Sequence, residues 1–485
     1  MAEENRAHSD KKDCLMLQYK EKVVTEGDKK MKIDKEQYKN VIRAGFVILL
    51  VACETIFFIY SWIENYNSYT VFPFFQKGHW MMAAMYVLFQ MIFLDVFGGL
   101  QLRYLKRSNI IYSQILALIF TNIIIYLQIV LLSVRFVTVV PLIRVTLYDI
   151  VIVVIIAWIS ELIFKKMFPP RRMLLIYEEY DPEAFIQKMN SRKDKYIVQD
   201  RFNISEGMEE LKKKIENYEG VVIYDVHAET RNKILKLCYE RDIRAYSTTK
   251  ISDILVRGAE TLHLFDTPLL LYRNNGLTFE QRFMKRTMDI VVSGLLLILT
   301  SPIFLIAAIA IKLYDGGPVF YRQTRYTLNY KKFDIYKFRS MIVDAEKDGK
   351  PQPATDKDSR ITPVGKVLRA TRLDELPQLI DIFVGNMSLV GPRPERVEHV
   401  EKYTEEVSEF AYRLKVRGGL TGYAQIYGKY NTSPYDKLQL DLIYIQNYSL
   451  LLDIRLILMT IKIMFMKEST EGFTEERKKE IQEKE

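Results

Sequence analysis

Four long apolar stretches fill the first third of the chain, at about Val41–Trp62, Trp80–Leu100, Ile110–Val134 and Val145–Phe164. Each is close to the ~20 residues that an α-helix needs to cross the hydrocarbon core of a bilayer. Helices that are apolar on almost every face do not suit the core of a small soluble domain. The pattern therefore predicts a membrane protein with four transmembrane helices, a four-helix bundle over residues 41–166.

Basic residues predict which ends of these helices face the cytosol. They crowd the N-terminal tail (residues 1–40) and follow the second and fourth stretches: Arg103, Lys106, Arg107, Lys165, Lys166, Arg171 and Arg172. The other two loops contain only Lys77 and, as weak counter-evidence, Arg135 and Arg144. The positive-inside rule then places the N-terminus and everything after residue 168 in the cytosol. The tail lacks the apolar segment of a secretory signal peptide.

Four carboxylates, Glu54, Asp95, Asp149 and Glu161, lie in or beside the apolar stretches. An ionisable residue inside a membrane is a functional candidate by default. Most of these lie near the ends of a stretch and form no ordered row, so we expect an interfacial role.

Residues 167–275 alternate between short apolar runs typical of strands and longer runs typical of helices. The expected strands are Met173–Tyr177, Tyr196–Val198, Val221–Val226 and Ile243–Tyr246, and the expected helices are Pro182–Met189, Met208–Tyr218 and Thr230–Arg241. This alternation predicts a cytosolic, Rossmann-like α/β domain with a parallel sheet. Its first turn carries Glu178, Glu179 and Asp181 without glycine, which would repel a pyrophosphate. We expect a scaffold, a regulator or an oligomerisation module.

A fifth apolar run, Ile290–Leu313, is long enough to cross a bilayer but contains Ser301-Pro302 at its middle. Proline removes a helical hydrogen bond and kinks the helix. Both flanks are basic, so the positive-inside rule places both ends in the cytosol. We therefore expect a kinked re-entrant helix over residues 284–313, with a proline-kinked crossing as the alternative.

Four sequence elements between Lys337 and Gly428 have the densest chemistry. They read KFRSM (337–341), GKVLRATRLDELPQL (365–379), MSLVGPRPE (387–395) and RLKVRGGLTGYAQ (413–425). Asp374 is suited to the N-cap of a helix, with Pro377 in its first turn, so Asp374 and Glu375 would lie at the positive end of the helix dipole. An Asp-Glu pair there is commonly no more than a cap and a solvated charge.

Nearby arginines and the overall charge favour a phosphate-directed site. Mg²⁺ binds one or two carboxylates and completes its shell with substrate phosphates, and arginines clamp phosphate oxygens. The net charge of +9 suits an anionic membrane surface, a phosphate-rich substrate or nucleic acid. Three distant cysteines (Cys14, Cys53 and Cys238) form no disulfide framework or zinc ribbon.

The ordered set of Ser-Pro hairpin, KFRSM, LDELPQL, SLVGPRP and GLTGYAQ resembles the bacterial sugar transferases, the polyprenyl-phosphate phosphoglycosyl transferases with one re-entrant helix. The resemblance covers about residues 279–465 and implies a mainly α catalytic domain at 276–466 with interfacial helices, followed by a charged tail (467–485). The chain as a whole resembles the long form that initiates capsule or exopolysaccharide repeat units.

The resemblance implies transfer of a sugar 1-phosphate from a UDP-sugar to undecaprenyl phosphate, with release of UMP. Asp374 would be the nucleophile that forms a covalent phosphosugar, and Asp374 and Glu375 would hold Mg²⁺. The candidate phosphate-binding residues are Arg369, Arg372, Arg393, Lys337 and Arg339, and Ser301 and Pro302 match the kink. Tyr326 and Thr327 stand where the family pattern leads us to expect glycines, a departure that concerns the loop and the sugar.

The expected location is the cytoplasmic membrane of a bacterium. The expected sugar is glucose or galactose, with an N-acetylated amino sugar as the alternative. A homodimer and contacts with other polysaccharide-assembly proteins are further expectations. Rival readings are a non-catalytic scaffold, which the Asp374-Glu375 pair disfavours, and a transporter built on the four spans, which show few polar residues. Nucleic-acid binding is disfavoured because the basic residues flank membrane segments. The charged, apolar run Leu440–Met466 reads as an interfacial or protein-packed helix.

Overall fold

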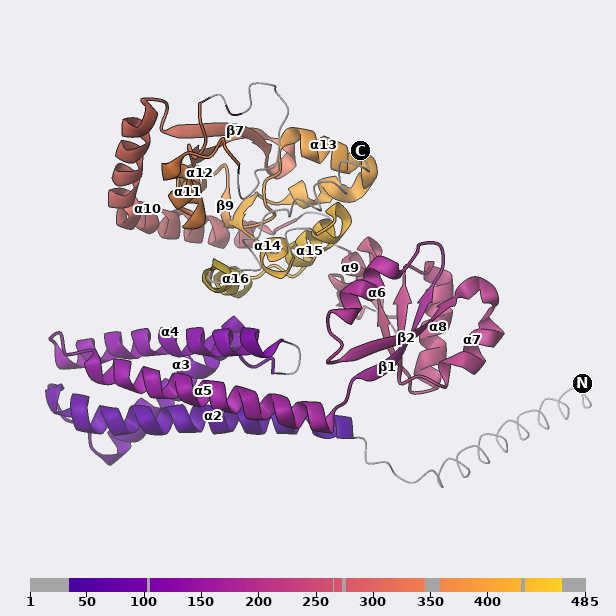
Figure 1. Ribbon diagram of the computed structural model, residues 1–485, viewed down its shortest axis with the longest axis horizontal. Coiled ribbons are helices and arrows are strands. Elements are labelled where there is room, and N and C mark those ends of the chain that lie inside the picture. The colour runs from indigo at the N-terminus through magenta and orange to yellow at the C-terminus, as the bar shows by residue number, and fades with distance from the viewer. Residues whose placement is uncertain are drawn as a thin grey trace, which may run out of the picture. The chain divides into compact units, whose positions relative to one another are not determined.

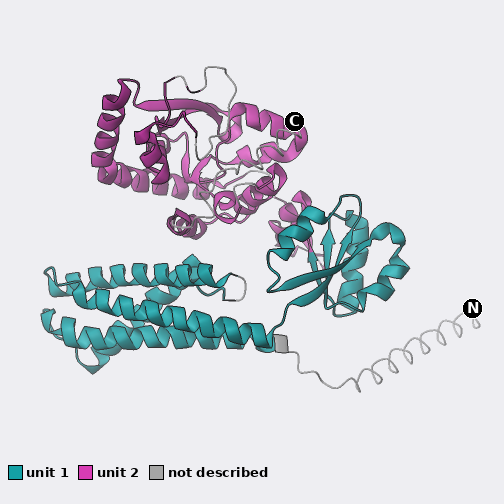
Figure 2. Ribbon diagram, in the orientation of Figure 1, with its two compact units in different colours: residues 1–246 teal, residues 247–485 magenta. Residues whose placement is uncertain are grey.

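The computed structural model describes residues 35–102, 105–264, 266–272, 276–343, 345, 358–428 and 432–464. They form two compact units, divided between residues 246 and 247 (Figure 2). This boundary lies within the segment 167–275 that the sequence assigns to one α/β domain. Most of the N-terminal tail and all of the tail 467–485 lie outside the described residues, as do Cys14 and Arg103.

The first unit begins with four long helices: α2 (Lys39–Ser61), α3 (Gln76–Phe97), α4 (Arg107–Ser133) and α5 (Val140–Met167), shown in indigo and violet in Figure 1. Short helical turns flank α2: η1 (Lys35–Tyr38), η2 (Trp62–Tyr66) and η3 (Asn67–Tyr69). All four helices are long and apolar enough to cross a membrane, and only 28 to 39% of their most apolar windows is buried. Exposed apolar faces of this extent are what lipid would cover.

Two of the carboxylates in these helices are not interfacial, contrary to the sequence-based expectation. Glu54 and Asp149 are fully buried between helices. Their faces of α2 and α5 point at neighbouring helices, which the one-dimensional pattern does not reveal. Glu161, by contrast, lies near the end of α5 and pairs with Arg107 at 3.0 Å and Lys165 at 2.9 Å, while Asp95 is exposed near the end of α3.

The remainder of the first unit is a four-stranded sheet with strand order β2-β1-β3-β4. The strands are β1 (Arg171–Tyr177), β2 (Tyr196–Asn203), β3 (Gly220–Tyr224) and β4 (Arg244–Ser247), with helices α6 (Glu183–Asn190), α7 (Met208–Ile215) and α8 (Ala228–Glu240) and the turn η4 (Ile204–Glu206) between them. β1 pairs in parallel with both β2 and β3, as the alternation predicts. At the first turn, Glu178 accepts from the backbone of His227 at 2.6 Å and contacts its ring at 3.0 Å.

The second unit contains one very long helix and many short elements. In order, they are α9 (Ile251–Arg257), β5 (Glu260–Leu262), β6 (Leu269–Leu271), α10 (Phe279–Asp315), β7 (Phe320–Tyr326), η5 (Leu328–Tyr330), β8 (Lys332–Phe338), α11 (Pro363–Ala370), η6 (Leu373–Glu375), α12 (Gln378–Val384), β9 (Ser388–Val390), α13 (Val397–Glu406), η7 (Ser408–Lys415), β10 (Gly419–Thr421), α14 (Tyr423–Tyr427), α15 (Pro434–Gln446) and α16 (Leu450–Met464).

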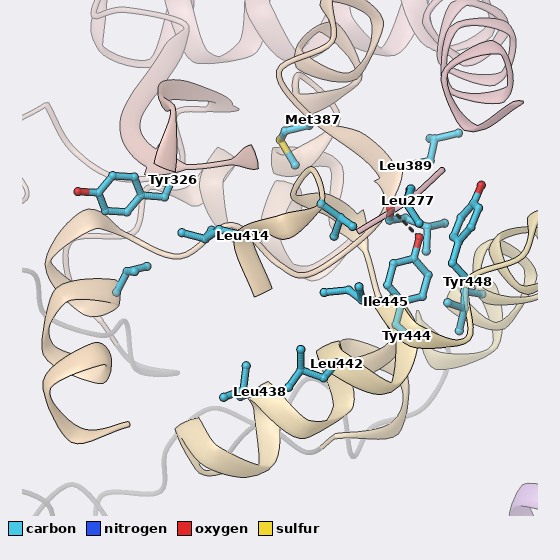
Figure 3. Packing of buried hydrophobic residues seen from close by; sticks show 14 of the residues in the cluster. Leu277, Tyr326, Met387, Leu389, Leu414, Leu438, Leu442, Tyr444, Ile445 and Tyr448 are labelled. Atoms are coloured by element: carbon cyan, nitrogen blue, oxygen red, sulfur yellow. Dashed lines mark hydrogen bonds between the residues drawn. The ribbon is translucent and has the colours of Figure 1, made fainter. Parts of the chain in front are cut away.

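The core of this unit lies between α15 and the β9 segment (Figure 3). Leu438, Leu442 and Ile445 lie along one face of α15, and Met387 and Leu389 come from β9 and the residue before it. The hydroxyl of Tyr444 donates to the carbonyl of Val390 at 3.3 Å. The described part of this run, residues 440–464, therefore lies mainly in two helices, with Asp441 and Asp453 buried inside the protein, so the protein-packed alternative holds for this part of the chain.

The helix α10 is bent in Figure 1, and Pro302 lies within it. Its first half is fixed to the core, because Lys285 pairs with Asp453 at 2.7 Å and Asp289 accepts from the backbone of Leu389 at 2.9 Å. Its last residue, Asp315, pairs with Arg339, which follows β8. Both ends of α10 are thus held by the same folded unit.

Candidate active site

The Asp374-Glu375 pair lies in a tight turn between α11 and α12. Arg372 has φ 57° and ψ 16°, a left-handed conformation that reverses the chain after α11. Such a backbone costs a residue with a Cβ about 1 kcal/mol, and strain of this kind is frequent at functional sites. The residues Leu373–Glu375 then form a 3-10 turn.

The expected N-cap role of Asp374 is wrong. The helix α12 begins at Gln378 with Pro377 as its N-cap, and no side chain caps it. Asp374 lies inside the 3-10 turn, and Leu376 and Pro377 follow that turn before α12 begins, so its carboxylate does not cap the helix amides. The Asp374 carboxylate therefore has no capping role.

Close backbone packing brings Arg393 to this turn. β9 and β10 pair in parallel, with Ser388 opposite Gly419 and Val390 opposite Thr421. A Cβ on Gly419 would overlap the backbone of Gly391, so glycine is required where SLVGPRP meets GLTGYAQ. The amide of Gly419 also donates to the carbonyl of Pro392 at 2.9 Å. The Gly-Pro-Arg-Pro segment is therefore held rigidly beside the strand pair.

Lys337 reaches the same turn from β8. The residues that follow β8 pack against α11, because the amide of Thr362 donates to the carbonyl of Ser340 at 3.1 Å. A Cβ on Gly365 would overlap that same Ser340 backbone. This contact fixes KFRSM against the helix that leads into Asp374.

The carboxylate of Glu375 is the centre of the cluster. Its Oε1 accepts from Lys337 Nζ at 2.8 Å and from Arg393 at 2.6 Å, and its side chain is only 15% exposed. Burial alone would raise its pKa, but the charges of Arg393 and Lys337 outweigh burial and hold the pKa well below its usual value. Burial lowers the pKa of Lys337, and Glu375 opposes that change. Glu375 is thus an anion at neutral pH.

Asp374 is half-buried beside this cluster, and among the described residues its carboxylate makes no hydrogen bond or ion pair. Burial raises its pKa, and the neighbouring Glu375 adds to the rise, while Lys337, Arg369 and Arg372 act in the opposite direction. A desolvated carboxylate without a partner, surrounded by cations, is suited to attack a phosphorus atom.

The structure gathers most of the candidate residues but not Arg339. Lys337, Glu375 and Arg393 are in direct contact, and Arg369 and Arg372 are close enough to Asp374 to change its pKa. Arg339 is buried against Asp315 at the end of α10 instead. Ser301 and Pro302 lie within α10, where Ser301 donates to the carbonyl of Ile298 at 2.8 Å.

The sequence did not predict a second ion network, which contacts the backbone of Arg393. Arg413 donates to the carbonyl of Arg393 at 3.0 Å and pairs with Asp441 at 2.7 Å, and Lys437 pairs with Glu395 at 2.9 Å. Burial alone would raise the pKa of Glu395, but the charges of Lys437 and Arg413 outweigh burial and lower the pKa to about 2. Arg413 and Glu395 belong to the recognised motifs, yet nothing in a linear pattern shows that Asp441, on α15, completes the network.

The departure at Tyr326 and Thr327 has a structural explanation. Tyr326 is buried at the end of β7, and its hydroxyl contacts Glu401 at 3.2 Å. Thr327 donates to the carbonyl of Asn386 at 2.9 Å. The left-handed residues of this hairpin are Asn329 and Tyr330, so the positions where we expect glycines do not need glycine here.

A magnesium ion fits the residues of this site only with help from a substrate. Among the described residues, no group of three or more His, Cys, Asp or Glu side chains gathers to hold a metal. Lys337 and Arg393 occupy Oε1 of Glu375, which leaves its other oxygen and the Asp374 carboxylate. Two carboxylates completed by substrate phosphates and water form a common Mg²⁺ site.

Among its described residues, the second unit combines a carboxylate without a partner, a cation-bound glutamate and a rigid arginine turn with a helix that is long and apolar enough to cross a membrane. Residues 280–467 match the family described as "Bacterial sugar transferase". A "UDP-glucose:undecaprenyl-phosphate glucose-1-phosphate transferase" of Caulobacter vibrioides is 41% identical over 36% of this chain and 68% of its own length. The chain belongs to the bacterial sugar transferase family.

Two longer relatives match over a smaller share of their length. A Klebsiella pneumoniae protein with the same printed name is 39% identical over 51% of this chain and 53% of its own length. A "UDP-N-acetylgalactosamine-undecaprenyl-phosphate N-acetylgalactosaminephosphotransferase" of Aeromonas hydrophila is 37% identical over 50% of this chain and 59% of its own length. The chain thus spans little more than half the length of these two relatives.

Proposed function

We propose that this chain transfers a sugar 1-phosphate from a UDP-sugar to undecaprenyl phosphate, giving undecaprenyl-diphosphate-sugar and UMP. The observation that carries the proposal is the Asp374 carboxylate, which has no partner among the described residues and adjoins the Lys337–Glu375–Arg393 cluster. The names of the relatives support the same substrates.

The reaction proceeds in two displacements at one phosphorus atom. An Asp374 oxygen attacks the sugar-bearing phosphate, the bond from that phosphorus to the bridging oxygen breaks, and UMP leaves with the bond electrons. An oxygen of undecaprenyl phosphate then attacks the same phosphorus, and the Asp374–phosphorus bond breaks. The carboxylate is regenerated, and a new diphosphate links the lipid to the sugar.

The surrounding residues would stabilise negative charge rather than move protons. Phosphoryl transfer depends chiefly on positioning and charge neutralisation. The Arg393 guanidinium and the Lys337 ammonium both donate to Glu375, which would hold them beside Asp374. Bound Mg²⁺, held by Asp374 and the second oxygen of Glu375, would supply further neutralisation of the diphosphate.

We propose that α10 enters the bilayer and returns to the same side. Apolar residues of its first half, such as Val292 and Leu296, pack with the main core of the unit, and Ala307 and Ile311 of its second half pack against Phe338 and Leu368. A helix that crossed would place these contacts on opposite sides of ~30 Å of hydrocarbon. The bend at the middle of the helix supports the re-entrant form.

The wider architecture and setting follow from the same proposal. The four N-terminal helices would form a transmembrane bundle, and the sheet a Rossmann-like scaffold. The catalytic unit would face the cytosol at the bacterial inner membrane, where lipid phosphate and nucleotide sugar meet. UDP-glucose or UDP-galactose is the proposed donor, with an N-acetylated sugar as the alternative, and the protein would act as a dimer with other polysaccharide-assembly proteins.

The test is UMP release by the purified full chain with Mg²⁺ and undecaprenyl phosphate, across a panel of UDP-sugars. We expect release with one donor, dependent on lipid, and a loss of at least 1,000-fold in Asp374→Asn, the order expected for removal of a nucleophile. Asp334→Asn, an exposed carboxylate on β8, is the matched control and should retain activity. Folded protein that releases no UMP with any sugar would refute the proposal.

A further inference from the structure

A polar cluster lies among the four N-terminal helices of the first unit. Glu54 of α2 accepts from Gln90 of α3 at 2.8 Å, and Gln90 in turn accepts from Thr121 of α4 at 2.7 Å. Asn122 of α4 donates to Thr146 of α5 at 2.8 Å, one helical turn before Asp149. The four helices therefore contribute to two groups of polar contacts, which meet at the adjacent residues Thr121 and Asn122 of α4.

Two carboxylates in this network lack the partners that their burial requires. Glu54 and Asp149 are both 0% exposed. Within the part of the chain that the structure describes, neither oxygen of Asp149 has a hydrogen-bond partner, and nor does Oε1 of Glu54. Among the described residues, no lysine, arginine or histidine pairs with either side chain. Placing ionised carboxylates out of water costs several kcal/mol for each ion unless a positive charge compensates.

A buried hydroxyl belongs to the same place. Tyr86 of α3 is 0% exposed, and its hydroxyl has no hydrogen-bond partner among the described residues. Its ring stacks on Phe58 with centroids 4.5 Å apart. Phe58 lies one turn beyond Glu54 on α2, and Gln90, the partner of Glu54, lies one turn beyond Tyr86 on α3. The Tyr86 hydroxyl is close enough to Glu54 and Asp149 to interact electrostatically with both carboxylates.

Among the described residues, both side-chain amide nitrogens of this network have a partner, so the buried polar atoms without one are oxygens. Gln90 gives its amide to Glu54 and Asn122 gives its amide to Thr146. The oxygens left without partners are Glu54 Oε1, Asp149 Oδ1 and Oδ2, Asn122 Oδ1 and the Tyr86 hydroxyl. A proton can join only a pair of oxygens, whereas a hard metal ion collects several carboxylate, amide and hydroxyl oxygens.

We propose that Glu54, Asp149, Tyr86 and Asn122 form a binding site for a hard metal cation within the membrane part of the chain. The cation would neutralise the carboxylates and join the four helices through oxygen ligands. A divalent ion such as Ca²⁺ would balance both charges, and Na⁺ would balance one, with a proton on the other carboxylate. Both ions share the same oxygen chemistry, so experiment must separate them.

The first test is thermal unfolding of the full chain in lipid nanodiscs, in choline chloride, NaCl or CaCl₂ at equal ionic strength. Binding to the folded state raises Tm in proportion to the logarithm of cation concentration. We expect such a rise with Na⁺ or Ca²⁺ in the wild type, and its loss in Asp149→Asn and Glu54→Gln. These substitutions keep side-chain size and remove only charge.

Glu64→Gln, which changes an exposed carboxylate in the same helical region, is the control and should respond as the wild type does. All of these variants retain the Asp374-Glu375 pair, so any cation bound there contributes equally to each. Equilibrium dialysis with radioactive ²²Na⁺ or ⁴⁵Ca²⁺ should show one fewer cation bound per chain in Asp149→Asn.

Three outcomes would overturn the proposal. The first is a wild-type Tm that is the same in choline, sodium and calcium. The second is a cation response that Asp149→Asn retains in full. The third is a Tm that depends on pH alone, because that would show that protons neutralise the pair. The wild-type comparison decides the first and third outcomes even where a variant fails to fold.

Discussion

Lys337 and Arg393 donate to the same oxygen atom, Oε1 of Glu375, at 2.8 and 2.6 Å. They come from separate elements of the second unit, β8 and the turn after β9, and meet only at this carboxylate. Glu375 is therefore the part that positions the two cations relative to each other. Asp374, its neighbour in sequence, stays without a partner among the described residues.

Glu375→Gln should reduce kcat strongly, by about 100-fold or more, because a neutral amide cannot hold both cations in place. The protein should remain folded, since the amide keeps the size of the carboxylate. UMP release under saturating substrate measures the effect, with Glu398→Gln, an exposed residue of α13, as the matched control. Near-normal kcat in Glu375→Gln would show that Glu375 is only a structural residue.

The acid limb of the pH–rate profile should report ionisation of Asp374. Its pKa is raised above the usual value by burial, and only the ionised form attacks, so kcat/KM should fall as pH falls through that raised pKa. Lys337 lowers the pKa of Asp374. Removing this charge in Lys337→Met should therefore move the acid limb to higher pH. This shift is expected in addition to any overall loss of rate.

The profile of Lys337→Met is compared with that of Lys332→Met, which removes an exposed charge from the other end of β8. An acid limb that lies at the same pH in all three proteins would mean that a group other than Asp374 controls it.

Removing one partner of the buried Lys285–Asp453 ion pair should strongly destabilise the second unit. Asp453 is 0% exposed and also accepts from Tyr444 at 2.7 Å. Lys285→Met leaves a buried carboxylate unpaired, a loss of about 3–5 kcal/mol. Thermal unfolding in nanodiscs should show a much lower Tm.

The double variant Lys285→Met with Asp453→Leu removes both charges and should recover most of the lost Tm. If the double variant is as unstable as the sum of the two single variants, the ion pair is not what couples α10 to α16.

Pro302→Leu should favour a straight α10 and reduce activity by more than tenfold. Leucine restores the backbone amide that proline lacks, so the helix regains a hydrogen bond. The measurement pairs UMP release with labelling of Gly316→Cys by a membrane-impermeant reagent in oriented vesicles, in a background in which Cys14, Cys53 and Cys238 are replaced by serine. Cytosolic labelling is expected in the parent, with loss of that labelling where the variant crosses the bilayer. Ser301→Ala, which keeps the proline, is the control.

The elements were largely predictable from the sequence, and the contacts between them were not. The apolar stretches and the strand–helix alternation depend on local periodicity, so α2–α5 and β1–β4 lie close to the predicted positions. The N-cap assignment of Asp374 failed because the left-handed Arg372 and the 3-10 turn are local backbone choices that residue spacing does not encode. Arg393 and Lys337 were found through motif letters, since no pattern indicates that they share Glu375.

Long-range partners explain the remaining differences. Lys285 lies in the basic flank that precedes the fifth apolar run, but it is buried against Asp453, 168 residues later in the chain. Arg339 was grouped with phosphate ligands, but it lies against Asp315. In each case the charge was visible in the sequence and its counter-charge could be assigned only in three dimensions.

Arg286 joins α10 to the helix that follows the catalytic turn. Its guanidinium donates to the carbonyls of Ile382 and Phe383, each at 2.7 Å, at the end of α12. Since α12 begins three residues after Glu375, a tilt of α10 would act through Arg286 on the segment that carries the carboxylates. The proposed placement of α10 in the bilayer therefore predicts that turnover varies with lipid chain length even when the substrates are unchanged.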